Sequence, residues 1–167
     1  MKILGVDPAL SITGYGLIDV SVSGIVLLEA GVIKTASRDP MASRLLRIYR
    51  AMHKLITDTS PQVMVLEKVY VHYGHPTTAF LLGQARGVIC LAGVANGLSV
   101  AEYAATRIKK AIVGNGRASK SQVQRMVMSE LSIRVPPAYT DVTDALALAL
   151  AHSAIARVDS LKGRIAR

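Results

Sequence analysis

Apolar and polar residues follow one another along this chain in blocks whose period changes, and the blocks predict a mixed α/β fold. The first apolar segments, at residues 3–6, 13–20 and 24–34, are rich in β-branched residues and lie only a few residues apart. Connections this short leave no room for crossover helices, so the three segments are expected to pair as an antiparallel meander.

The period then becomes helical. Residues 41–59 place apolar side chains on one face of a helix and Arg44, Arg47, Arg50 and Lys54 on the other. Residues 63–66 are continuously apolar, which is typical of a strand covered on both faces and implies a parallel crossover. The remaining pattern predicts a strand at 99–103 and helices at 76–96, 105–113, 119–131 and 141–156.

The length of 167 residues, 51% of them hydrophobic, suits one globular domain with its own core. No internal repeat or linker divides it. We expect the domain to occupy residues 1–156. Residues 157–167 form a basic C-terminal tail, either a frayed, solvated end or an extra phosphate contact.

Charge narrows the class of partner. Twenty Lys and Arg against eleven Asp and Glu give a net charge of +9, which favours a polyanion, nucleic acid before an anionic membrane. No apolar run approaches the roughly 18 residues of a membrane span, and no signal peptide is recognisable. Cys90, the one cysteine, lies in an apolar run and indicates a reducing compartment. We therefore expect a cytoplasmic protein without a membrane partner.

Four of the acids adjoin strongly apolar segments, where an uncompensated carboxylate is costly. Asp7 and Glu67 end predicted strands, while Asp141 and Asp144, three residues apart, open the last predicted helix. Strand ends and a helix start can meet at one edge of a sheet. Carboxylates without His or Cys suit Mg²⁺ or Mn²⁺, and three or four of them suit a pair of ions that hydrolyses a phosphodiester.

Each acid also has a simpler interpretation. Asp141 is a good helix N-cap with Asp144 completing a box-like arrangement, Asp7 before Pro8 starts a turn, and Glu67 can be the first solvated residue after a strand. For Asp141 and Asp144 taken alone, capping is the stronger explanation. Only the four acids together favour a metal site.

Several longer motifs carry a resemblance, and they run from Lys2 to about Ala156. They are Gly5-Val6-Asp7-Pro8, Thr13-Gly14-Tyr15-Gly16, Leu82-Gly83-Gln84-Ala85-Arg86-Gly87, Lys120-Ser121-Gln122-Val123 and Asp141-Val142-Thr143-Asp144-Ala145-Leu146. Together with Glu67 they resemble the RuvC family of bacterial Holliday junction resolvases. The resemblance implies an RNase H-like fold, a five-stranded mixed sheet with its first three strands antiparallel and flanking helices, assembled as a homodimer.

The resemblance also assigns roles. It implies that Asp7, Glu67, Asp141 and Asp144 bind Mg²⁺, two ions per subunit, and cleave DNA. Lys109 and Lys120 match basic positions near the scissile phosphate, with a solvated surface lysine as the alternative. Tyr70 stands where the family places an aromatic residue, usually Phe, and its ring can stack on an unpaired base. Ala9 replaces a common Gly, which would cause strain if that position required a positive φ.

The sequence thus favours a Mg²⁺-dependent enzyme that makes paired nicks in four-way DNA junctions during recombination and repair, with RuvA and RuvB as the partners that the resemblance implies. A non-catalytic junction-binding protein would tolerate a broken acidic set, and here the set is complete. An actin-like kinase or ATPase shares the first hairpin but needs a second nucleotide-binding domain, for which 167 residues leave no space.

Overall fold

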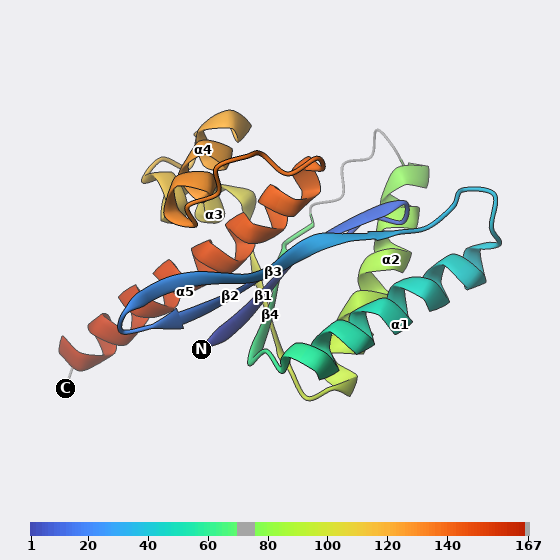
Figure 1. Cartoon of the computed structure of the whole chain (residues 1–167), viewed down its shortest axis with the longest axis horizontal. Helices are drawn as coiled ribbons and strands as arrows, with labels where there is room; N and C mark the ends of the chain where they lie inside the picture. Colours follow the sequence, from blue (N-terminus) through green and yellow to red (C-terminus); the bar gives the residue numbers. More distant parts are fainter. Residues whose placement is uncertain (70–75, 166–167) are drawn as a thin grey trace.

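A computed structural model describes residues 1–69 and 76–165 of the chain. In it a single five-stranded mixed sheet has helices on both faces (Figure 1). The strands are β1 (Lys2–Asp7), β2 (Ile12–Ser21), β3 (Gly24–Lys34), β4 (Val63–Glu67) and β5 (Ser99–Tyr103), in the spatial order β3-β2-β1-β4-β5. The first three strands pair antiparallel, while β4 runs parallel to β1 and to β5. The expected meander and parallel crossover are confirmed.

Two helices cover one face of the sheet and three lie on the other (Figure 1). Helices α1 (Met41–Thr59) and α2 (Pro76–Ala95) pack over Leu4 and Met64, among other apolar residues. Helix α5 (Thr140–Ile165) lies along the opposite face, with α3 (Ala105–Val113) and α4 (Lys120–Glu130) packed against it. Strand alternation sorts neighbouring residues between the two cores.

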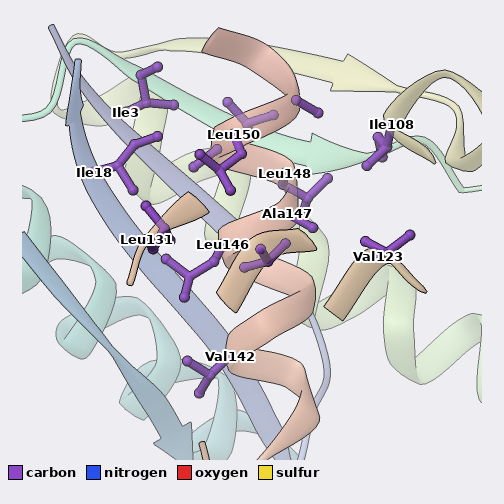
Figure 2. Close-up of a cluster of buried hydrophobic side chains, with 14 of the residues drawn as sticks. Ile3, Ile18, Ile108, Val123, Leu131, Val142, Leu146, Ala147, Leu148 and Leu150 are labelled. Carbon is purple, nitrogen blue, oxygen red and sulfur yellow. The ribbon is translucent and has the colours of Figure 1, made fainter. Parts of the chain in front are cut away.

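The core on the α5 side is the one that adjoins the acidic residues. Leu146 of α5 lies on the side of the helix toward Ile18 and the sheet, whereas Leu148 lies toward Ile108 of α3 and Val123 of α4 (Figure 2). The helix meets strands β1 and β2 along much of its length. Its rotation and height above the sheet are therefore fixed by apolar packing.

Both ends of α5 differ from the sequence prediction, the C-terminal end by several residues. Helix α5 begins at Thr140 and continues to Ile165, whereas the periodicity placed its end at 156. Apolar residues recur at helical spacing through this extension, at Val158, Leu161 and Ile165, and the Arg107 guanidinium lies 3.8 Å from the Asp159 carboxylate. The segment expected to fray is helical up to Ile165.

A third difference concerns the apolar content of α2. The stretch Thr77–Ala95 has 19 residues and a mean hydropathy of 1.5, so by length and composition alone it could cross a membrane, contrary to the sequence reading. A core helix passes the same test. Here α2 packs against α1 and β5 and leaves one apolar face exposed.

Candidate active site

The strand register brings Asp7 and Glu67 to the same edge and the same face of the sheet. Ile3 pairs with Val63 and Val6 with Leu66 in the parallel β1–β4 ladder, and the two acids follow at the next position. Since side chains alternate along a strand, Asp7 shares the α5 face with Ile3, as Glu67 does with Val63 and Val65. Each acid is the last member of a row that is otherwise buried beneath α5.

Glycines opposite these rows allow α5 to lie against the sheet backbone. Gly14 is the β2 partner of Asp7, and Gly16 is the partner of Gly5. A Cβ atom at Gly5 would overlap the carbonyl oxygen of Ala145 and lie 2.9 Å from the Ala149 nitrogen. At Gly14 it would overlap the backbone of Asp141. The first turns of α5, with Asp141 and Asp144, are therefore held directly beside Asp7.

Two lysines complete the surroundings of the acids. Lys120 is the first residue of α4, and a reciprocal capping box fixes the start of this helix. The backbone N–H of Gln122 donates to Ser119 Oγ, and the backbone N–H of Ser119 donates to Gln122 Oε1. From this fixed helix start, Lys120 Nζ reaches within 2.6 Å of Asp144 Oδ2. Lys109 comes from α3 and is half-buried.

These side chains meet around one cavity of about 280 Å³. Its polar lining consists of Asp7, Glu67, Asp144, Lys109 and Lys120, and its apolar lining includes Ile108, Val123, Ala147 and Leu148. Asp141 does not line the cavity, although its charge acts on Asp7. The cavity joins three of the four predicted acids with both predicted lysines.

The electrostatics show how crowded the carboxylates are. Burial, followed by the charges of Asp144, Asp141 and Glu67, raises the pKa of Asp7 from 3.8 to about 7, with Lys120 opposing the shift. Burial and Asp144 likewise raise the pKa of Glu67, while Lys109, Arg86 and Lys120 lower it. The hydrogen bond to Asp144 raises the pKa of Lys120. The site carries negative charge that the protein compensates only in part.

The donor set fits a hard divalent cation. Carboxylate oxygens, with no His or Cys near them in the cavity lining, are what Mg²⁺ or Mn²⁺ prefers, and a cation would relieve the repulsion acting on Asp7. In the side-chain conformations present, no three His, Cys, Asp or Glu side chains within residues 1–69 and 76–165 are close enough to share one ion. A common ligand set for one ion thus requires these side chains to move closer together than they lie here.

Three further predictions concern helix capping by Asp141 and Asp144, the backbone at Ala9 and the position of Tyr70. Within the described residues, no backbone N–H donates to the Asp141 or Asp144 carboxylate, and α5 begins before both, so neither caps the helix. Ala9 is not among the residues with a positive φ, so the expected strain does not arise. Tyr70 lies outside the described residues.

Sequence reasoning missed two contributions to the site. No structural role was predicted for the glycines of β1 and β2, although glycine repeated at i and i+2 in a strand indicates that another backbone approaches that face closely. Arg86 was also passed over. Its Nη2 donates to Glu102 Oε1 at 2.5 Å, and its charge lowers the pKa of Glu67. The presence of this charged residue in a largely apolar predicted helix was the sequence feature that indicated a polar role for Arg86.

Comparison with known families agrees with this arrangement. Residues 3–152 match the family model described as crossover junction endodeoxyribonuclease RuvC. A protein of that description from Rhodopirellula baltica is 43% identical over 148 residues, which cover 89% of this chain and 83% of the relative. Another from Burkholderia pseudomallei is 45% identical over 153 residues, or 92% of this chain and 83% of the relative.

Solved structures give the same result at the level of the fold. RuvC from Thermus thermophilus superposes with a TM-score of 0.88 at 29% identity, covering 95% of this chain and 97% of that one. The same protein in complex with a Holliday junction substrate matches equally well, at a TM-score of 0.88. The yeast mitochondrial Holliday junction resolvase Ydc2 shares the fold at a TM-score of 0.67. With the family model spanning nearly all of the sheet and its helices, this chain belongs to the RuvC family of crossover junction endodeoxyribonucleases.

Proposed function

We propose that this chain resolves Holliday junctions by hydrolysing DNA phosphodiester bonds at the cavity between β1, β4 and α5. One observation carries the proposal: three acids and two lysines line a single cavity in a chain with a net charge of +9. The lysines attract a phosphodiester, and the acids offer oxygen ligands beside it. The relatives named as crossover junction endodeoxyribonucleases, and the Thermus thermophilus complex with junction DNA, support that substrate.

In the proposed mechanism the protein residues have distinct tasks. Asp7, Glu67, Asp141 and Asp144 hold Mg²⁺, for which Mn²⁺ can substitute, two ions per subunit. When bound, such ions lower the pKa of a water and stabilise the leaving oxygen in an in-line displacement. Lys109 and Lys120 contact the scissile phosphate and orient it toward the acids. Lys120 Nζ lies 2.6 Å from Asp144 Oδ2. Its ammonium thus partly neutralises this carboxylate, a role that a bound cation would take over.

The substrate's two-fold arrangement also calls for two copies of the site. We propose that α2 forms the contact between two subunits, because its residues Phe80, Leu91 and Val94 are more than 60% exposed. Gly83 and Gly87 lie at compatible helical spacing and have open space above them. A helix pair through this face would bury the apolar stretch that otherwise meets water.

Further elements of the proposal extend to the cell. The RuvA and RuvB branch-migration proteins are the expected partners, the cytoplasm is the expected location, and no membrane is involved. Tyr70 is proposed to stack on a base at the crossover, and the nuclease domain of residues 1–156 to be followed by the basic C-terminal segment 157–167, which continues α5 up to Ile165. These statements rest on the family and on the sequence.

Cleavage of a labelled four-way junction tests the proposal directly. With Mg²⁺, the protein should nick opposing strands of the junction at symmetric positions and leave a linear duplex of the same sequence nearly uncut. With EDTA, cutting should stop while junction binding in a gel-shift assay persists. Equal cutting of junction and duplex would remove the claim of structure selectivity.

A further inference from the structure

Arg44, in the first turn of α1, is a buried guanidinium whose hydrogen-bond partners are neutral. Only 9% of the residue is exposed. Its Nε donates to Thr35 Oγ1 and its Nη2 to Ser11 Oγ, each at 2.9 Å. Across residues 1–69 and 76–165, no carboxylate forms an ion pair with it. Burying a charge without an opposite charge is costly, so the bonds that it makes must matter to the fold or to function.

One of its partners lies in the loop through which the chain leaves Asp7, and the other binds that loop. Ser11 lies in this loop, between β1 and β2. Thr35 follows β3, and it binds the same loop twice: its amide donates to the Ser11 carbonyl at 3.0 Å, and its hydroxyl to the Leu10 carbonyl at 2.5 Å. Arg44 thus binds the Thr35 hydroxyl, which joins the residue after β3 to the loop, and the Ser11 hydroxyl within the loop itself.

The other side of the loop is fixed independently. Buried Thr13 donates its hydroxyl to the Ala9 carbonyl at 2.6 Å and accepts from the Ala9 amide at 3.3 Å. Residues 9–11 are therefore held from β2 by Thr13 and from α1 and β3 by Arg44 and Thr35. The planar guanidinium suits this position because its donors point in fixed, separate directions, which a lysine ammonium cannot reproduce.

We propose that Arg44 is a positioning residue for Asp7, which fixes the loop after β1 and thereby the direction in which the Asp7 carboxylate faces Glu67 and Asp144. This inference rests on the proposed function of the cavity. Arg44 acts through the loop and not through its charge, because the charges that dominate at Asp7 come from Asp144, Asp141, Glu67 and Lys120. Its low exposure also sets it apart from a residue that contacts DNA directly.

The test compares Arg44→Met and Arg44→Lys with Arg50→Met, which removes the same charge from an exposed position of the same helix. Ser11→Ala provides a milder change that removes a single acceptor from an exposed loop residue and leaves the core intact. Three quantities are measured for each: single-turnover cleavage of a four-way junction at saturating protein with Mg²⁺, junction affinity in EDTA, and amide hydrogen exchange of residues 9–12 under native conditions, well below the Tm.

We expect Arg44→Met, Arg44→Lys and Ser11→Ala to lower the saturated cleavage rate by about 10- to 100-fold, the effect of a catalytic group displaced by a fraction of an ångström to an ångström. Affinity should stay within about twofold of Arg50→Met, and exchange at residues 9–12 should rise. Combining Ser11→Ala with Arg44→Met should add little further loss, since both break one connection.

Three results would overturn the inference. Wild-type cleavage and exchange in Ser11→Ala and Arg44→Lys would show that the connection is not needed. A loss of affinity that disappears at high salt, with the saturated rate unchanged, would make Arg44 a phosphate contact instead. Unchanged exchange at residues 9–12 would exclude an action through the loop even if cleavage fell. Failure of wild type and Arg50→Met to cleave junctions would instead contradict the proposed function. The exchange data would still test whether Arg44 holds the loop in place.

Discussion

Asp7 is the residue at which the requirements of folding and of chemistry are most opposed. It ends a strand whose residues 3–6 are buried, and its neighbours across the cavity are further acids. Apolar packing of α5 on the glycines forces these carboxylates together, so part of the packing energy is used against electrostatic repulsion. The raised pKa of Asp7, about 7, reports that conflict in the protein without a cation.

A pH-dependent stability follows from this shift. An unfolded Asp titrates near 3.8 and folded Asp7 near 7, so between these values the folded state binds the extra proton. Stability in EDTA should therefore fall as the pH rises from about 4 to about 7 and remain low above it. Asp7→Asn should lack this contribution, on the order of a few kcal/mol. Urea unfolding of both proteins at about pH 5 and pH 8 measures it, and identical pH dependence would contradict the shift.

A second prediction at the scale of single residues concerns Lys109 and Lys120. Lys109→Ala and Lys120→Ala should each lower the cleavage rate, and any loss of junction affinity should shrink as salt rises, because phosphate contacts are screened. Lys110→Ala, an exposed neighbour outside the cavity, is the control for the loss of one charge. Cleavage rates and affinities at low and high salt provide the measurement. Cleavage equal to that of Lys110→Ala would show that both lysines are ordinary solvated surface residues without a role in cleavage.

At the scale of elements, the position of α5 depends on the absence of side chains in β1 and β2. Gly5 and Gly14 face the backbone of α5, whereas Gly16 faces the flexible end of the Leu146 side chain. Helix backbone cannot give way without moving the whole helix, but a leucine side chain can change its rotamer. The glycines therefore differ in what they control.

We expect Gly5→Ala and Gly14→Ala to be more harmful than Gly16→Ala. The first two should displace α5, lower the unfolding free energy by about 1–3 kcal/mol or more, and reduce cleavage beyond the loss of folded protein, because Asp141 and Asp144 move with the helix. Gly16→Ala should cost less in both measurements. Thermal unfolding and saturated cleavage rates test the order, and equal effects at all three positions would refute this account of α5.

Helix α2 carries a prediction about assembly. Leu91→Glu places a charge in the proposed subunit contact and should convert a dimer to monomers, with loss of paired nicking. Val22→Glu adds the same charge to a fully exposed turn and should leave the assembly unchanged. Light scattering after size-exclusion chromatography gives the mass. A monomeric wild type, or a Leu91→Glu dimer, would remove α2 from the contact.

For the molecule as a whole, the order and type of the elements were predicted because strands and helices differ in the length and period of their apolar positions. The end of α5 was placed too early because the basic content of residues 157–167 favoured a tail, although Val158, Leu161 and Ile165 continue the apolar residues at helical spacing. The candidate acids were predicted from their position beside apolar runs, after two strands and at the start of the last helix. What no local pattern contains is the three-dimensional closeness of α5 to Gly5 and Gly14, or the link from Arg44 to Ser11, because both join residues distant in sequence.

The central claim, that the four carboxylates form a metal-dependent nuclease centre, is tested most directly by Asp7→Asn. The change keeps the size of the side chain and removes one of the mutually repelling charges. In EDTA the variant should melt at or above the temperature of wild type. It should lose most of the stabilisation that Mg²⁺ gives wild type, bind junctions normally and fail to cut them. A fully active Asp7→Asn variant whose melting temperature still rises with Mg²⁺ as in wild type would contradict the account.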